Sequence, residues 1–322
     1  MKISAKLFDK KTEYAKIFKR LSAATEDPRE VLKRAQKTTS KNTWYVRRAA
    51  VLYIGKRLLQ VSRVQQSGES AAAHKKRQEF LMRLINYFSA YGCPITKENR
   101  TPRCSKRKVM SGLKPNWRLD LLNCVYEPYA KAYVVAALTG CRPAELLRGV
   151  EIAVEGDLVT FKIYGAKVTD KNGQPTRELT VDIALLDSAM KKVLLAGMRD
   201  ETKGTPVHGA VATVQISCRR NFSAAVLNAW RKHTEYRSLK KVTAYCLRHA
   251  FASDLKANDF SAEEIAVALG HASTSTQTCY GKSQMAKGGL GCVTEINGSR
   301  VVRSTTKLWS RSQPGPSPKR IP

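Results

Sequence analysis

The stretch LVTFKIYGAKVTDKNGQPTRELTVDI, residues 158–183, decides the fold class. Its two ends, 158–164 and 178–183, have the composition and spacing of β-strands. Asp-Lys-Asn-Gly at 170–173 lies between them and predicts a turn. The stretch therefore predicts an antiparallel hairpin, and helical patterns precede and follow it. We expect a mainly α protein with a small antiparallel β-sheet.

The chain is strongly basic. Its 322 residues include 57 Lys and Arg against 26 Asp and Glu, a formal net charge of +31. Basic side chains displace counterions from phosphates, so a polyanion is the expected partner. A membrane surface is a weaker alternative, because no apolar run is long enough to span a bilayer and no secretory signal stands at the N-terminus. Eight cysteines without metal-ligand or Cys-x-x-Cys spacing predict reduced, mostly buried thiols in a cytoplasmic protein.

Residues 1–92 predict a helical domain. Apolar residues recur at helical spacing over 44–59 and 80–88. Given the net charge, we expect the basic faces between them to lie on DNA. The basic residues of these faces are Arg47, Arg48, Lys56, Arg57, Lys75, Lys76 and Arg77.

The composition of residues 93–118 predicts a basic linker. Three prolines interrupt helical patterns there, and basic residues accumulate with almost no acids. The residues expected to contact DNA are Arg103, Lys106, Arg107 and Lys108. A second domain is expected over 119–287, followed by a tail over 288–322. Within that tail, Asn-Gly at 297–298 predicts a small hairpin, and the Ser-, Pro- and base-rich end is expected to be disordered.

Three motifs in the second domain carry chemistry. They are TGCRPAELL at 139–147, YCLRHAFAS at 245–253 and LGH at 269–271, and Tyr280 follows the last histidine by nine residues. Together they resemble the tyrosine recombinase (phage integrase) family. That family has an arginine in T-G-x-R-x-x-E/D-L, an H-x-L-R-H-x-F-A segment, then L-G-H and a nucleophilic tyrosine. The resemblance covers roughly residues 119–282, and it implies a helical core-DNA-binding domain before an α+β catalytic domain.

The resemblance implies DNA cleavage through a 3′-phosphotyrosine on Tyr280. Arg142 and Arg248 would hold the pentavalent transition state, because guanidinium groups stay charged and can bond bidentately. His271 would donate to the same oxygens or orient the nucleophile, and Glu145 would support the site. The phosphotyrosine stores the bond energy, so no metal or cofactor is expected.

Two proton transfers accompany this chemistry. In the family, a lysine on the hairpin protonates the leaving 5′-oxygen, and Lys167 is favoured for this role over Lys171. The family usually has histidine three residues before the second arginine, but Tyr245 stands there. Tyrosine is a poor base at neutral pH, so the group that takes the proton from Tyr280 stays open. His249 is expected to pack in its helix.

Type IB topoisomerases use the same catalytic set and are the nearest alternative. A DNA-binding protein that has lost activity is another, supported only by Tyr245. A recombinase would act as a homotetramer on two duplexes, and the tail is long enough to insert into a neighbouring subunit. Tyr245 and this tail favour integration, excision or cointegrate resolution of a mobile element over chromosome dimer resolution. The expected partners are DNA with a specific core site and accessory DNA-bending proteins, at the bacterial nucleoid.

Overall fold

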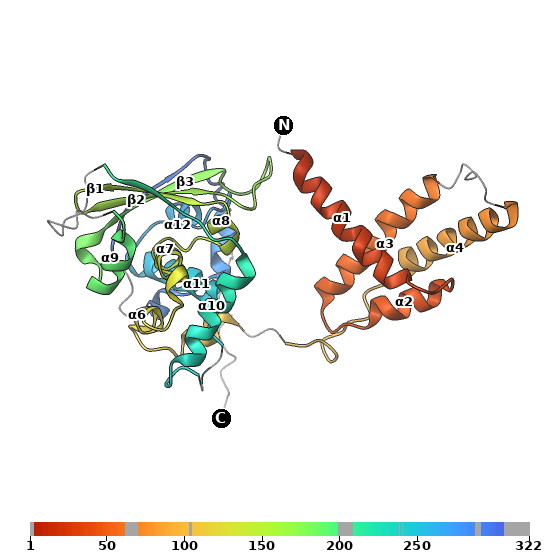
Figure 1. Ribbon diagram of the computed structural model, residues 1–322, viewed down its shortest axis with the longest axis horizontal. Coiled ribbons are helices and arrows are strands. Elements are labelled where there is room, and N and C mark those ends of the chain that lie inside the picture. Colours follow the sequence, from red (N-terminus) through yellow and green to blue (C-terminus); the bar gives the residue numbers. More distant parts are fainter. Residues whose placement is uncertain are drawn as a thin grey trace, which may run out of the picture. The chain divides into compact units, whose positions relative to one another are not determined.

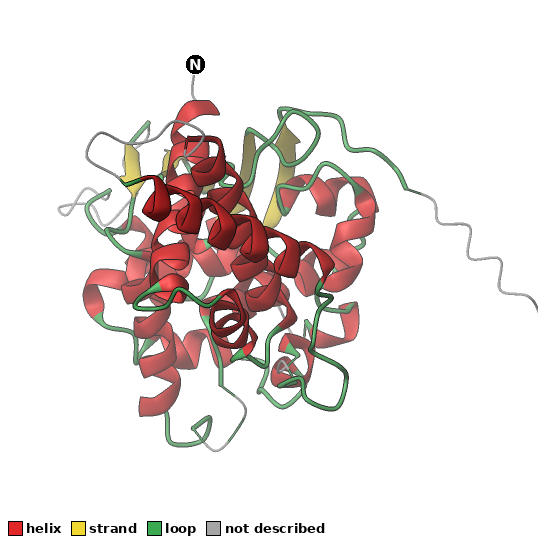
Figure 2. Cartoon of the chain, turned by 90° about the vertical axis from the view of Figure 1, so that its right-hand side faces the viewer, coloured by secondary structure: helices red, strands yellow, loops and turns green. Residues whose placement is uncertain are grey.

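The computed structural model describes residues 3–61, 70–102, 105–198, 209–237, 239, 241–286 and 291–305. The chain divides into two compact units, residues 1–103 and 104–322. Helices make up most of the described chain, and its few strands form one antiparallel sheet in the second unit (Figures 1 and 2). The prediction of a mainly α fold with a small antiparallel sheet is confirmed.

The regular elements of the first unit are all helices among its described residues. Its helices are α1 (Ile3–Ser22), α2 (Pro28–Gln36), α3 (Lys41–Val61) and α4 (Ala71–Ala90). Asp27 caps α2 by accepting a hydrogen bond from the Arg29 backbone, and Ser70 caps α4 by accepting one from Ala73. The core of the unit lies between α1, α2, α3 and α4. Its buried residues include Val31, Leu32, Trp44, Val51, Leu84 and Phe88.

The predicted linker over 93–118 ends earlier than expected. Lys106–Met110 forms α5, and Trp117–Leu122 forms α6. Apolar side chains on both sides of Pro115 enter the core of the second unit, and tertiary burial thereby overrides the linker-like composition. The side chains concerned are Val109, Met110, Leu113 and Trp117. The basic residues of 106–108 therefore belong to the second unit.

The second unit is built on a five-stranded antiparallel sheet in the order β4-β1-β2-β3-β5. The strands are β1 (Val150–Glu155), β2 (Leu158–Tyr164), β3 (Thr176–Asp182), β4 (Val211–Val214) and β5 (Val293–Gly298). The predicted hairpin is present as β2 and β3, whose register runs from Leu158–Asp182 to Tyr164–Thr176. Alternate residues of β2 are buried, so one face of the sheet points into the core. Strands β1 and β4 were not predicted.

Helices cover the buried face of the sheet (Figure 1). The helices are α7 (Ala130–Thr139), α8 (Pro143–Leu146), α9 (Ser188–Leu195), α10 (Arg219–Lys232), α11 (Ala244–Ala257) and α12 (Ala262–Ala268). Short 3₁₀ helices are η1 (Glu127–Tyr129), η2 (Ile183–Leu185), η3 (Thr274–Cys279) and η4 (Ser283–Met285). Helix α7 is buried from Ala132 to Thr139 and packs against α11, while α12 packs against β3 and β5. This arrangement brings the ends of α7, α11 and α12 together.

The prediction of a hairpin at 297–298 is wrong. Residues Val293–Gly298 form one continuous strand, β5, which pairs with β3 and covers an edge that would otherwise expose unpaired backbone groups. Arg303 then forms a bridge with Ser273. Residues 291–305 therefore pair with β3 and Ser273 of their own unit in the single chain. The expected disordered end lies outside the described residues.

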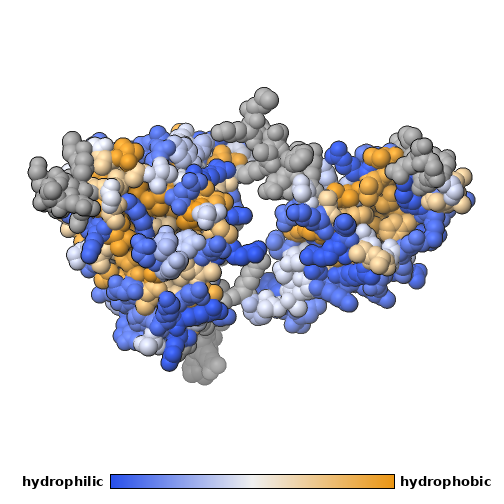
Figure 3. All heavy atoms as spheres, viewed as in Figure 1, coloured by the Kyte–Doolittle hydropathy of each residue, from blue (hydrophilic) through white to orange (hydrophobic). Residues whose placement is uncertain are grey.

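Hydrophilic side chains cover much of the face shown in Figure 3, as the basic composition requires. None of the described helices combines the length and the apolar character needed to cross a bilayer.

Candidate active site

The three sequence motifs meet in the second unit. Helix α7 ends at Gly140, which has φ +58°, and a Cβ there would lie 2.5 Å from the Phe251 ring on α11. This close approach places Arg142, at the start of α8, beside α11. Arg248 lies on α11, and His271 follows the turn that ends α12. The structure thus brings together residues separated by more than a hundred positions in sequence.

Arg248 is the centre of the cluster. Its Nε donates to the Tyr280 hydroxyl at 3.2 Å, and its Nη1 donates to the Gly140 carbonyl at 2.8 Å. Nη2 donates to the Leu269 carbonyl and lies 3.2 Å from Nε2 of His271. Burial, followed by the nearby charge of Arg142, lowers the pKa of Arg248 to about 10, so the group stays charged at neutral pH. One guanidinium therefore contacts all three motifs and the tyrosine.

Glu145 is the only carboxylate among the described residues of this cluster. It accepts hydrogen bonds from the Arg142 backbone N at 2.8 Å, from Arg142 Nη1 at 2.6 Å and from Arg177 Nη2 at 2.9 Å. Burial acts to raise the pKa of Glu145, but the charges of Arg177, Arg142 and Arg248 outweigh burial and hold that pKa well below its usual range. Glu145 is therefore ionised, and it positions Arg142 at the start of α8.

Arg177 was missed by the sequence analysis. It lies on β3, its side chain is fully buried, and its Nε donates to the Ala268 carbonyl at 2.7 Å. A signal was present, because Arg177 occupies an inward position of the strand together with Leu179 and Val181. A charged residue at an inward strand position is rarely fully buried unless it is paired.

The two histidines flank the tyrosine ring. The ring centroid of Tyr280 lies 4.8 Å from that of His249 and 5.5 Å from that of His271. Burial and arginine charges lower the pKa of His249 to about 4 and that of His271 to about 3, so both rings are neutral at pH 7. An arginine can only donate, so Nε2 of His271 accepts from Arg248 and the ring proton lies on Nδ1. His249 was expected to pack in its helix, and on α11 its ring packs against Tyr280.

The backbone after η3 is held by two basic residues. Arg107 Nε donates to the Tyr280 carbonyl at 2.8 Å, and Lys256 Nζ donates to the Gly281 carbonyl at 2.8 Å. A Cβ at Gly281 would overlap Ser253 Oγ and lie 2.7 Å from the His249 carbonyl. Glycine is thus required for the chain to pass this close to α11 and present Tyr280.

Three residues expected at the site stand apart from this hydrogen-bonded cluster. Lys167 is exposed in the loop between β2 and β3, and Lys171 in the same loop contributes its carbonyl to Arg303. Tyr245, in the first turn of α11, is 43% exposed. In the described part of the chain, no hydrogen bond joins any of these side chains to the cluster. Their catalytic roles stay predictions.

The basic residues expected to bind DNA differ in how they are engaged. Arg47 donates to three carbonyls at the end of α2, and Arg48 donates to the Phe88 and Ser89 carbonyls at the end of α4. These two guanidinium groups therefore hold helix ends within the first unit. Lys76 pairs with Glu26 at 2.5 Å.

The other basic residues in the expected set show no common role. Lys56, Lys75 and Lys108 are exposed. Arg57 donates to the Tyr53 hydroxyl, and Arg77 lies 3.5 Å from a His74 ring nitrogen. Lys106 contributes to the lowered pKa of His249, while Arg103 lies outside the described residues.

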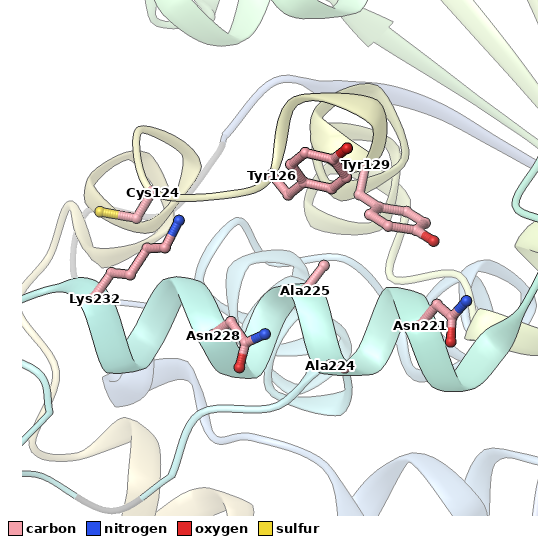
Figure 4. A pocket seen from close by; sticks show the side chains of 8 residues that line it. All are labelled: Cys124, Tyr126, Tyr129, Asn221, Ala224, Ala225, Asn228 and Lys232. Atoms are coloured by element: carbon pink, nitrogen blue, oxygen red, sulfur yellow. The ribbon is translucent and has the colours of Figure 1, made fainter.

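A pocket of about 350 Å³ lies elsewhere on the second unit, between η1 and α10 (Figure 4). Tyr126, Tyr129, Asn221 and Asn228 line it, and Lys232 is the one charged residue among the residues that line it. It contains none of the motif residues and no acid–base pair, so it is not the catalytic candidate.

The chain was compared with known proteins at three levels. No protein-family model matches it, and no curated protein matches it. Among solved structures it is similar to the XerH site-specific recombinase bound to a palindromic difH substrate, in a post-cleavage complex. The identity is 17%, the TM-score is 0.37, and the match covers 79% of this chain and 80% of that one. A similarity at this level does not identify a function.

Proposed function

We propose that the chain is a tyrosine site-specific recombinase that cleaves and rejoins DNA strands, with Tyr280 as its nucleophile. The supporting observation is the Tyr280 hydroxyl, which Arg248 Nε holds at 3.2 Å within a buried cationic cluster. Arg142, Arg177 and Arg248 face one carboxylate, Glu145, so positive charge is left uncompensated. Buried unpaired charge is unfavourable, and a phosphodiester would offset it.

The proposed reaction is a reversible transesterification. The Tyr280 oxygen attacks the phosphorus, the bond to the 5′-oxygen breaks, and a 3′-phosphotyrosine and a free 5′-hydroxyl result. Arg142 and Arg248 would stabilise the charge that develops on the non-bridging oxygens. The Nδ1–H of His271 is buried and has no partner in the described part of the chain, so it is available to donate to the same oxygens. Lys167 is proposed to protonate the leaving oxygen.

Several features support DNA as the substrate and a mobile element as its source. The net charge of +31 favours a polyanion. Residues 1–92 are proposed to bind the core site, and four copies of the chain are proposed to assemble on two duplexes. The tyrosine at 245, in place of the histidine usual in the family it resembles, favours a mobile-element enzyme over a chromosome-maintenance enzyme.

A type IB topoisomerase-like enzyme is the second candidate. Residues 291–305 support it, because in the single chain they pair with β3 and Ser273 of their own unit. Such an enzyme would use the same cluster to nick and reseal one strand as a monomer.

A trapping experiment tests the shared chemistry. Nicked duplexes with a randomised core lose a short fragment on cleavage, so the covalent adduct accumulates and can be sequenced. We expect a DNA adduct that resists denaturation for the wild type and none for Tyr280→Phe, with DNA affinity retained. If the adduct persisted in Tyr280→Phe, or never formed with the wild type, the proposal would be overturned.

The two candidates are then separated with the recovered core sequence. A recombinase should exchange strands between two differently labelled duplexes and form a complex of four chains. A topoisomerase-like enzyme should relax a supercoiled plasmid as a monomer and give no exchanged product.

A further inference from the structure

Arg177 has an unusual set of contacts for a buried arginine. Its Nε donates to the Ala268 carbonyl at 2.7 Å and its Nη2 donates to Glu145 Oε2 at 2.9 Å. Its Nη1 is buried and has no hydrogen-bond partner within the described residues. The guanidinium thus joins β3 to two other elements. These are α8, which belongs to the first motif, and the end of α12, where the third motif begins.

The unpaired nitrogen lies beside the turn that presents His271. Gly270 has φ +62°, and a Cβ built there would lie 2.9 Å from Arg177 Nη1 and 3.5 Å from Arg142 Nη1. The two guanidinium groups therefore border the same glycine. Only a residue without a side chain fits this position, so the turn, Arg142 and Arg177 are packed as one unit.

Glu145 divides its oxygens between the two arginines. Oε1 accepts from Arg142 Nη1, while Oε2 accepts from Arg177 Nη2 and from the Arg142 backbone. A carboxylate and a guanidinium commonly pair through two parallel hydrogen bonds. Because Arg177 occupies Oε2, Glu145 binds the Arg142 guanidinium through one nitrogen alone, as far as the described residues show.

We propose that Arg177 is a positioning residue that shares Glu145 with Arg142 and holds the Gly270–His271 turn, and that it thereby keeps Arg142 available to the scissile phosphate. This role rests on the proposed function. Arg177 is not proposed to bind the phosphate, since its Nε and Nη2 are engaged by the Ala268 carbonyl and Glu145. The positive charge of Arg177 neutralises Glu145, so the positive charge of Arg142 stays available to the phosphate. Without Arg177, the whole charge of Glu145 would act on Arg142, which already bonds both carboxylate oxygens.

The test compares Arg177→Met with a matched control that also breaks a buried ion pair. Arg118 pairs with Asp254 at 2.5 Å, both side chains are almost fully buried, and neither belongs to the cluster. Arg118→Met should lower the melting temperature about as much as Arg177→Met. Single-turnover adduct formation, well below both melting temperatures, should fall roughly a hundredfold in Arg177→Met and change little in Arg118→Met.

A double variant separates positioning from support of the fold. In Glu145→Gln/Arg177→Met the residue at 145 can still cap α8 but no longer neutralises Arg142. We expect it to form adduct about tenfold faster than Arg177→Met, because Arg142 is released. Equal rates in these two variants, or equal losses in Arg177→Met and Arg118→Met, would show that Arg177 only supports the fold.

A readout without catalysis keeps this inference separate from the proposed function. Inorganic phosphate should raise the melting temperature of the wild type more than that of Arg142→Met, and this difference measures anion binding at Arg142. Arg177→Met should lose the same increment, whereas Arg118→Met should keep it. If the wild type formed no adduct, the proposed function would fail, and the phosphate increment would still decide the role of Arg177. An increment unchanged in Arg177→Met would overturn that role.

Discussion

Arg107 donates a hydrogen bond from Nε to the backbone carbonyl of Tyr280 at 2.8 Å, across 173 positions of sequence. Arg107 lies on α5, in a segment whose composition predicts an open linker. Through this contact the segment holds the backbone of Tyr280, the proposed nucleophile. Arg107 therefore contributes a structural contact at the site in addition to its positive charge.

Substitution of Arg107 should slow cleavage without unfolding the unit. Arg107→Met removes a charge-assisted hydrogen bond, which is worth about 1.5–3 kcal/mol. We expect single-turnover adduct formation to fall roughly tenfold or more. Lys108→Met, which removes an exposed neighbouring charge, is the matched control for DNA affinity. Equal rates in the two variants would contradict a role in positioning Tyr280.

Gly281 should not tolerate a side chain. In Gly281→Ala the new methyl group would overlap Ser253 Oγ, so the backbone of Tyr280 must move away from α11. We expect adduct formation to be lost or to fall by at least two orders of magnitude, because the tyrosine oxygen leaves its attack position. Ser253→Ala should restore part of the activity, but not all, since the His249 carbonyl also lies 2.7 Å from the added atom. Full activity in Gly281→Ala would show that this close approach is not needed.

Stability should fall as the solution is acidified below neutral pH. Burial and arginine charges lower the pKa of His249 to about 4 and that of His271 to about 3, from an ordinary value of 6.5. Between pH 6.5 and about 4 the unfolded chain binds protons that the folded chain does not, so the free energy of unfolding rises with pH in this window. Urea midpoints measured across the window should show a smaller slope in His249→Gln and in His271→Gln. A slope unchanged in both variants would contradict the burial of neutral histidines.

The proposed role of Lys167 in protonating the leaving group can be tested with a modified substrate. Lys167→Ala should cleave ordinary DNA slowly but should cleave a substrate with a 5′-bridging sulfur at nearly the wild-type rate, because a thiolate leaves without a proton. Lys171→Ala is the matched control from the same exposed loop. Rescue of Lys171→Ala in place of Lys167→Ala would reassign the role.

Local patterns predicted the parts of the fold that depend on neighbouring residues. The hairpin of β2 and β3 follows from strand composition around a turn, and the helices of the first unit follow from apolar spacing. The order of the three motifs indicated which arginines, histidine and tyrosine to examine, and the structure brings these side chains together. Motif spacing could not predict β1, β4 or the pairing of β5 with β3, because short strands are stabilised by distant partners.

The sequence by itself determined the chemical groups of the site, since Arg142, Arg248, His271 and Tyr280 each stand in a recognisable local motif. Only the tertiary structure decided what surrounds them. Arg177 reaches Glu145 across 32 positions, and Arg107 reaches the Tyr280 carbonyl across 173. The inward position of Arg177 on β3 is a signal of burial, but the sequence does not indicate which distant group receives either arginine. Burial removes the solvent option, and the fold alone decides which side chains are buried together.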